Sequence, residues 1–76
     1  MEVKILGGGC SNCKNLEKNT REALDELGIT TEITKVTDYK EITSYGVLRT
    51  PALMVDGRIL VSGRVAKARE IVKLLG

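Results

Sequence analysis

An alternation of strand-like and helix-like segments constrains this chain more than any other feature of its sequence. Val3-Lys4-Ile5-Leu6 is a short apolar segment that ends at three glycines, and it predicts a buried strand. From Leu16 onwards, apolar or near-apolar residues recur at helical spacing until Gly28, which predicts a helix that begins near residues 10–13. Residues 29–36 are almost all β-branched and predict a second strand. A strand, a helix and a strand in this order favour parallel pairing of the two strands.

A short second helix follows in the sequence. Asp38 and Glu41 have the spacing of a capping box, in which Asp38 is the N-cap and Glu41 stands at the third helical position. Ile42 and Tyr45 give this helix an inner face, and Gly46 ends it. We expect Tyr39 and Tyr45 to pack at the edge of the core or on the surface.

The last part of the sequence predicts a hairpin and a final helix. Residues 51–55 and 58–62 read as strands, and Asp56-Gly57 between them is a strong signal for a two-residue turn. Apolar residues at helical spacing between 65 and 75 predict the final helix. The order β-α-β-α-β-β-α predicts an α/β fold with a mixed four-stranded sheet flanked by helices, in a single domain over residues 1–76.

Composition excludes several classes of function. The 76 residues contain no His, so catalytic dyads and triads that need an imidazole are impossible. Twelve Lys and Arg against ten Asp and Glu leave a net charge of +2, which argues against binding to nucleic acid or to an anionic membrane. The sequence has neither a spanning apolar segment nor the pattern of a secretory signal, so we expect a cytoplasmic protein.

Cys10 and Cys13 are the chain's two cysteines, and they lie between the first strand and the first helix. Three residues apart on a first helical turn, two cysteines have Cα atoms about 5–6 Å apart, within the range of a disulfide. Unpaired N–H groups at a helix N-terminus stabilise a thiolate. We therefore expect Cys10 to be the more exposed, to have the lower pKa and to act as the nucleophile. Cys13, one turn further, would resolve the mixed disulfide.

The chain resembles the thioredoxin-like fold at three places: the Cys10-Ser11-Asn12-Cys13 segment, Thr50-Pro51 before the third strand, and the order of elements. The resemblance covers essentially the whole chain and is closest to the small single-domain thioredoxin-like proteins of archaea and bacteria, often labelled redox-active disulfide proteins. It implies that Pro51 is a cis proline opposite the cysteines and that the Thr50 backbone pairs with a substrate's backbone. Gly9, Ser11 and Asn12 would complete the substrate contacts, since glycine next to Cys10 lets a partner chain approach closely.

The sequence also departs from ordinary thioredoxin. Gly9 stands where thioredoxin has Trp, and Ser11-Asn12 replace the Gly-Pro between the cysteines. The first strand contains no Asp or Glu that could accept a proton from the resolving cysteine. Because the intervening pair tunes the reduction potential, that potential cannot be carried over from a relative.

Three alternatives to redox chemistry remain open at this point. The two thiolates suit a soft metal such as Cu(I), although copper carriers of this size use a β-α-β-β-α-β order and have Met where Gly8 stands here. The pair could instead be two inert buried thiols or a structural bridge, although closing a four-residue loop contributes little stability. The domain could also be a non-catalytic interaction module. A Cys-x-x-Cys beside a βαβ pattern favours redox chemistry over all three.

The sequence thus predicts a thiol–disulfide oxidoreductase of the thioredoxin and glutaredoxin type. Its expected partners are protein disulfides or dithiols and an unidentified reductase. We expect no cofactor and no resident metal, since the electrons reside in the sulfur pair, and we expect a monomer.

Overall fold

The computed structural model describes residues 1–9 and 11–76, so Cys10 lies outside the described residues. The elements in chain order are β1 (Val3–Leu6), α1 (Ser11–Glu26), β2 (Ile33–Val36), α2 (Tyr39–Ser44), β3 (Ala52–Val55), β4 (Arg58–Ser62) and α3 (Ala68–Leu75). This is the predicted β-α-β-α-β-β-α order, and the predicted α/β fold class is confirmed.

The four strands form one mixed sheet in the order β2-β1-β3-β4. β1 is parallel to β2 and antiparallel to β3, and β3 is antiparallel to β4. Both expected kinds of pairing are therefore present: the βαβ unit gives the parallel pair, and the hairpin gives one of the two antiparallel pairs. β1 and β3 lie at the centre, and all four residues of β3 are buried.

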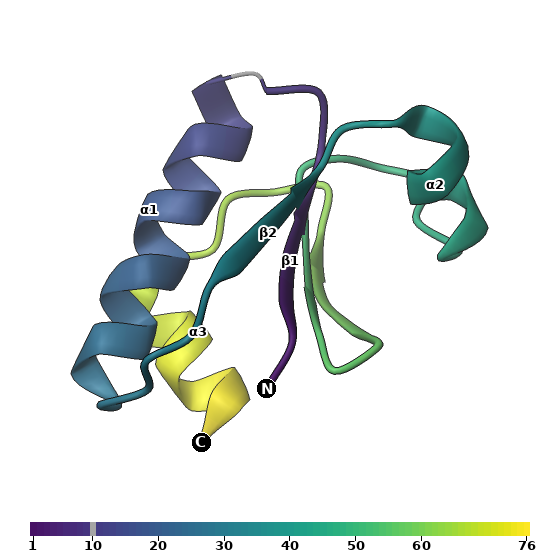
Figure 1. Ribbon diagram of the computed structural model, residues 1–76. Helices are drawn as coiled ribbons and strands as arrows, with labels where there is room; N and C mark the ends of the chain where they lie inside the picture. The colour runs from purple at the N-terminus through teal and green to yellow at the C-terminus, as the bar shows by residue number, and fades with distance from the viewer. Residues whose placement is uncertain (10) are drawn as a thin grey trace.

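Helices cover both faces of the sheet (Figure 1). α1 and α3 lie together on one face, and α2 lies on the other. Because side chains alternate along a strand, Ile5 and Leu53 face α1 and α3, whereas Leu6 and Met54 face α2. The core under α1 and α3 is the larger, with buried Val3, Ile5, Leu16, Ala23, Leu24, Leu53, Val55, Val61, Ala66 and Ile71.

β2 is shorter than the sequence predicted, because it begins at Ile33 and not at Ile29. The Ile29 N–H donates to the Leu24 carbonyl at 2.9 Å, so this residue still caps the C-terminal end of α1. Thr31 is held by side-chain hydrogen bonds, since its carbonyl accepts from the Arg21 guanidinium and its hydroxyl donates to the Met1 carbonyl. The β-branched composition correctly predicted a strand. The first half of the predicted strand is instead engaged in hydrogen bonds with the preceding helix and lies outside the sheet.

Only one of the two hydrogen bonds of the predicted capping box is present at the start of α2. The Asp38 side chain accepts a hydrogen bond from the Lys40 N–H, as expected of an N-cap. The Glu41 carboxylate accepts from the Tyr45 hydroxyl at 3.0 Å, and does not act as the reciprocal half of a capping box. The Glu41 carboxylate is therefore engaged by a side chain one turn later in the chain, at the C-cap of α2, and not by the helix N-terminus.

The Asp56-Gly57 turn joins β3 to β4 as predicted. Both residues have a positive φ, 50° and 81°, which a tight turn between twisted strands requires. The Asp56 carboxylate also accepts from the Glu2 N–H at 2.7 Å, and the Asp56 N–H donates to the Glu2 carbonyl. The turn thus fixes the start of β1 as well as the hairpin.

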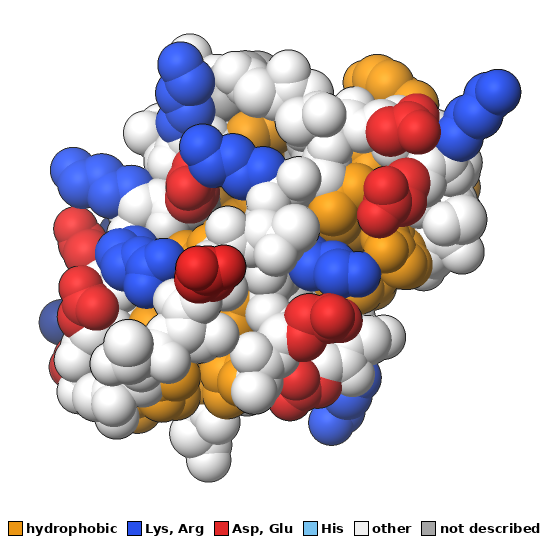
Figure 2. Space-filling model, in the orientation of Figure 1, with side chains coloured by type: hydrophobic (Ala, Val, Ile, Leu, Met, Phe, Trp, Pro, Cys, Tyr) orange, Lys and Arg blue, Asp and Glu red, His pale blue; other side chains and the backbone are white. Residues whose placement is uncertain are grey.

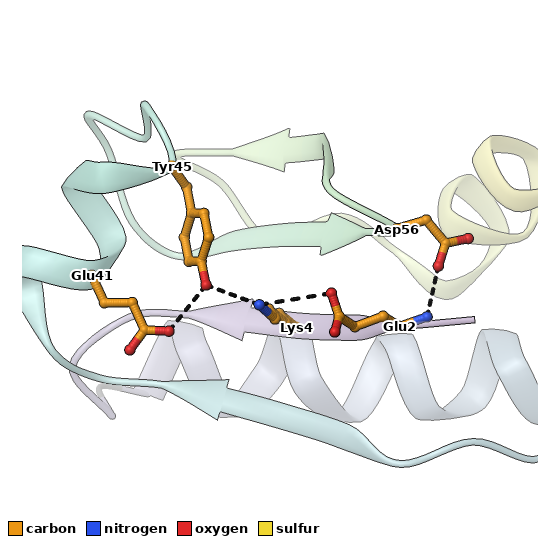
Figure 3. A network of polar contacts seen from close by, with 5 residues as sticks. All are labelled: Glu2, Lys4, Glu41, Tyr45 and Asp56. Atoms are coloured by element: carbon orange, nitrogen blue, oxygen red, sulfur yellow. Dashed lines mark hydrogen bonds and ion pairs between the residues drawn. The ribbon is translucent and has the colours of Figure 1, made fainter.

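A polar network ties β1 to α2 on the less covered face of the sheet (Figure 3). The Lys4 ammonium donates to the Tyr45 hydroxyl at 2.9 Å, lies 4.8 Å from the Tyr45 ring centroid and pairs with Glu2. The hydrogen bond to Tyr45 raises the pKa of Lys4 above its ordinary value, against the opposing effect of burial, and the charge of Glu2 adds to the rise. Tyr45 is therefore a packing residue, as the sequence suggested, while Tyr39 is 68% exposed.

No helix among residues 1–9 and 11–76 is long and apolar enough to cross a membrane.

Replacing Tyr45 with Phe tests this network. We expect the pKa of Lys4 to fall, because the variant loses the hydrogen bond that chiefly raises it. A raised lysine pKa stabilises the folded state fully below the unfolded value, and this contribution is lost as the pH rises through the folded value. Tyr45→Phe should therefore be less stable than the parent at neutral pH.

An NMR titration of Lys4, with denaturation at pH 7, measures both effects. Tyr39→Phe is the matched control, because it removes the same hydroxyl from an exposed ring. Equal Lys4 pKa values in the two variants would contradict the role given to Tyr45.

Candidate active site

The connection from β1 to α1 forms the floor of the candidate site. The Gly7 N–H donates to the Val36 carbonyl at 2.9 Å, which continues the β1–β2 ladder one residue beyond the strand. The chain then turns through the exposed Gly8 and Gly9, and Gly9 has a φ of 86° that only glycine adopts readily. α1 begins at Ser11, so Cys13 belongs to the first helical turn.

Cys13 is 5% exposed and packs directly against the backbone of Gly7. A Cβ placed on Gly7 would lie 2.3 Å from the Cys13 sulfur and 3.7 Å from the Thr50 Cβ. The sulfur therefore occupies the space that a side chain at position 7 would need. The same contact shows that Cys13 and Thr50 both lie beside Gly7, although they are far apart in the sequence.

The pairing of β3 with β1 brings the Thr50–Pro51 segment to Gly7 and Cys13. β3 pairs with β1 so that Ala52 lies opposite Leu6, which brings the preceding residues next to Gly7. The Thr50–Pro51 peptide bond is cis, and Pro51 is buried while Thr50 is half-buried.

The end of β4 holds the Thr50–Pro51 segment from its other side. The Gly63 N–H donates to the Pro51 carbonyl at 2.9 Å, and the Ser62 hydroxyl donates to the Arg49 carbonyl at 3.1 Å. Gly63 has a φ of 77°, and a Cβ there would lie 3.0 Å from the Arg49 Cβ, so the Arg49 stem packs on it. The backbone before β3 is therefore fixed by two hydrogen bonds and one close contact.

The structure thus places most of the residues singled out in the sequence. Cys13, Thr50 and Pro51 are brought together at one end of the sheet. Ser11 and Asn12 are exposed at the start of α1, next to Cys13 in the same turn. The predicted nucleophile, Cys10, lies outside the described residues.

A small pocket opens beside Cys13, and several of its residues were not singled out by the sequence. Its volume is about 60 Å³, enough for at least one water molecule, and Ile5, Gly7, Gly9, Cys13, Lys14, Glu17, Lys35 and Thr37 line it. Glu17 lies four residues after Cys13, so helical spacing alone could have indicated it. Lys35 could be found only with the register of the sheet, in which it lies opposite Ile5.

The electrostatics at the start of α1 favour negative charge on sulfur. The first turn of α1 contains no acidic residue, so its N-terminal N–H groups and partial positive charge are not offset there. Lys14 adds a cationic side chain at the pocket, while Lys35 is paired there with the Glu17 carboxylate at 3.2 Å. Figure 2 shows basic and acidic side chains interspersed over α1 and β2, so the positive potential is local. This environment stabilises a thiolate over a thiol.

Comparison with known proteins agrees with this geometry. The chain matches the family model of the thioredoxin domain over residues 1–76. It is 47% identical to a thioredoxin of Methanothermobacter thermautotrophicus over 75 residues, which are 99% of this chain and 97% of that protein. A thioredoxin of Methanocaldococcus jannaschii is 46% identical over 39 residues, which are 51% of this chain and 45% of that protein.

The fold and the site therefore define a thioredoxin-like protein. The chain belongs to the thioredoxin family, as a small member. It is a protein thiol–disulfide oxidoreductase, as predicted from the sequence. Nothing in these comparisons supports the soft-metal carrier considered as an alternative.

Replacing Gly7 with Ala tests the contact on which the site is built. The new methyl group would collide with the Cys13 sulfur, so the free energy of unfolding of the reduced protein should fall by about 1–3 kcal/mol, the usual range for overpacking. Chemical denaturation measures the effect.

Gly8→Ala is the matched control for this variant. No atom lies within 4 Å of a Cβ at Gly8, and neither glycine has a φ in the left-handed region. Both variants restrict the unfolded chain equally, so their difference isolates the contact with sulfur. If Gly7→Ala is as stable as Gly8→Ala, the sulfur does not occupy that space.

Proposed function

We propose that this protein exchanges disulfides with other proteins through Cys10 and Cys13, with Cys10 as the nucleophile and Cys13 as the resolving cysteine. The observation that carries the proposal is the position of the Cys13 sulfur, in the first turn of α1 and against Gly7 beside Thr50. A buried sulfur suits the resolving role, because a partner protein cannot reach it before a nearby cysteine has been engaged.

The exchange takes two steps. The Cys10 thiolate attacks one sulfur of the partner's disulfide, a bond between Cys10 and the partner forms, and the partner's other sulfur leaves as a thiolate. The Cys13 thiolate then attacks the Cys10 sulfur, the Cys10–Cys13 bond forms, and the partner's second sulfur leaves. The partner gains two electrons and the protein loses two, so the sulfur pair needs no cofactor.

Thr50, Pro51, Gly9, Ser11 and Asn12 are the proposed substrate-binding residues. The Thr50 backbone would pair with an extended segment of the partner, next to Cys13. Exposure of Gly9, Ser11 and Asn12 supports their contact with a partner chain, and the absence of a side chain at Gly9 allows close approach. The hydrogen bonds from Ser62 and Gly63 keep the segment around Pro51 in place before a partner binds.

The proposed cellular setting follows from the chemistry. The partners are proteins that carry disulfides or dithiols, together with a reductase that returns the Cys10–Cys13 pair to dithiol. A protein whose cycle needs reduced thiols fits the cytoplasm, where thiols are kept reduced. We propose that it acts there as a monomer.

Single serine variants test the two roles. Cys13→Ser should accumulate a mixed disulfide between Cys10 and a partner, because the step that releases the partner is lost. Cys10→Ser should accumulate none, because the buried Cys13 is not accessible to a partner. Mass spectrometry of adducts formed with a disulfide-containing protein measures both results. Adducts on Cys13 in the Cys10→Ser variant, and none on Cys10 in the other, would reverse the assignment.

A further inference from the structure

The pocket beside Cys13 contains a carboxylate that the proposed exchange leaves unused. Glu17 lines this pocket together with Cys13, and its side chain is only 30% exposed. The resolving step needs a group that takes a proton from the Cys13 thiol before its sulfur can attack. Within the described residues, Glu17 is the carboxylate among the residues that line the pocket.

Helix geometry directs Glu17 toward Cys13. Residues four apart in a helix lie one above the other on the same face, with Cβ atoms about 5–6 Å apart. Helical side chains lean toward the N-terminus, so a side chain at position 17 covers the surface of the preceding turn, where Cys13 lies. The pocket of about 60 Å³ between the side chains has room for a water molecule that could join the carboxylate to the sulfur.

An ion pair across the pocket fixes the Glu17 carboxylate. The Lys35 ammonium from β2 lies 3.2 Å from Glu17 Oε1, and Lys35 lines the same pocket. Among the described lining residues Lys14 is the other charged one, while Ile5 of β1 and Gly7 just after it carry no charge. Arg21, one turn after Glu17, donates to the Thr31 carbonyl. Both lysines of the pocket can stabilise a thiolate, but a protonated amine cannot accept the proton of the Cys13 thiol. Glu17 is therefore the lining residue, among those described, that can accept this proton.

We propose that Glu17 is the proton acceptor for the Cys13 thiol in the resolving step, and that Lys35 positions its carboxylate. The inference rests on the proposed resolving role of Cys13. The proton passes from Cys13 to Glu17, directly or through one water, and the Cys13 thiolate attacks the Cys10 sulfur. The Cys10–Cys13 bond forms, the bond between Cys10 and the partner breaks, and the departing thiolate takes a proton that Glu17 returns.

Stopped-flow reaction with dithiobis(nitrobenzoate) separates the two steps, because each releases one coloured thionitrobenzoate. The first release comes from attack by Cys10 and depends on reagent concentration. The second comes from resolution by Cys13 and does not. We compare the second rate across pH in the parent, in Glu17→Gln, and in Glu22→Gln as the control. Glu22 is exposed on the same helix and does not line the pocket.

We expect Glu17→Gln to slow the second release at least about tenfold near pH 7, since a positioned base contributes a factor of this order or more. The rate should approach the parent's above about pH 9, where solvent deprotonates an ordinary thiol. Glu22→Gln should match the parent at every pH.

Other results would overturn the inference and remain distinguishable from failure of the proposed function. A parent-like rate in Glu17→Gln at all pH values, or a loss by the same factor at all pH values, would show that Glu17 accepts no proton. A parent protein that gives no concentration-independent second release would instead refute the resolving role of Cys13.

Discussion

The contact between the Cys13 sulfur and the backbone of Gly7 is the constraint on which the rest of the site depends. A side chain at position 7 would overlap the sulfur, so glycine here lets the first turn of α1 lie against the end of β1. That approach places a buried thiol in the first turn of α1. It also places the thiol beside Thr50, because β3 pairs with β1 at the same end of the sheet.

The remaining structure keeps this arrangement rigid from both faces of the sheet. On one face α1 packs with α3, and Asn19 of α1 donates to the Ala66 carbonyl in the connection before α3. On the other face, Lys4 of β1 binds Tyr45 just after α2 (Figure 3). A chain of this size has a small core, so such specific polar contacts matter beside packing. A site on rigid elements can exchange disulfides without a large change of backbone.

Local patterns in the sequence predicted the elements of the fold well. Asp56-Gly57 predicted its turn because a positive φ at both residues has a strong residue preference. The predicted strand beginning at Ile29 was too long, because β-branched composition does not reveal that the Ile29 N–H caps the C-terminal end of α1. The partner of Glu41 was missed for a similar reason, since Tyr45 competes with the helix N-terminus for the carboxylate.

The parts of the site that belong to a sequence motif were predictable, whereas the contacts that depend on the assembly of the sheet were not. Cys-x-x-Cys and Thr50-Pro51 identified their segments, but the contact of Cys13 with Gly7 depends on how closely α1 approaches β1. Glu17 follows Cys13 at helical spacing, whereas Lys35 reaches the pocket through the register of β2 on β1. Periodicity indicates which residues share a face of a helix or strand, but only the assembled sheet shows which side chains that face packs against.

The proposed function requires Cys10 and Cys13 to interconvert between a dithiol and an internal disulfide. A redox titration with thiol alkylation, read by mass spectrometry of the intact chain, tests it most directly. We expect one reversible two-electron transition in which both cysteines lose or gain reactivity together and the oxidised monomer is lighter by two hydrogens. Two cysteines that stay alkylatable at every potential, or that oxidise only to a disulfide between two chains, would contradict it.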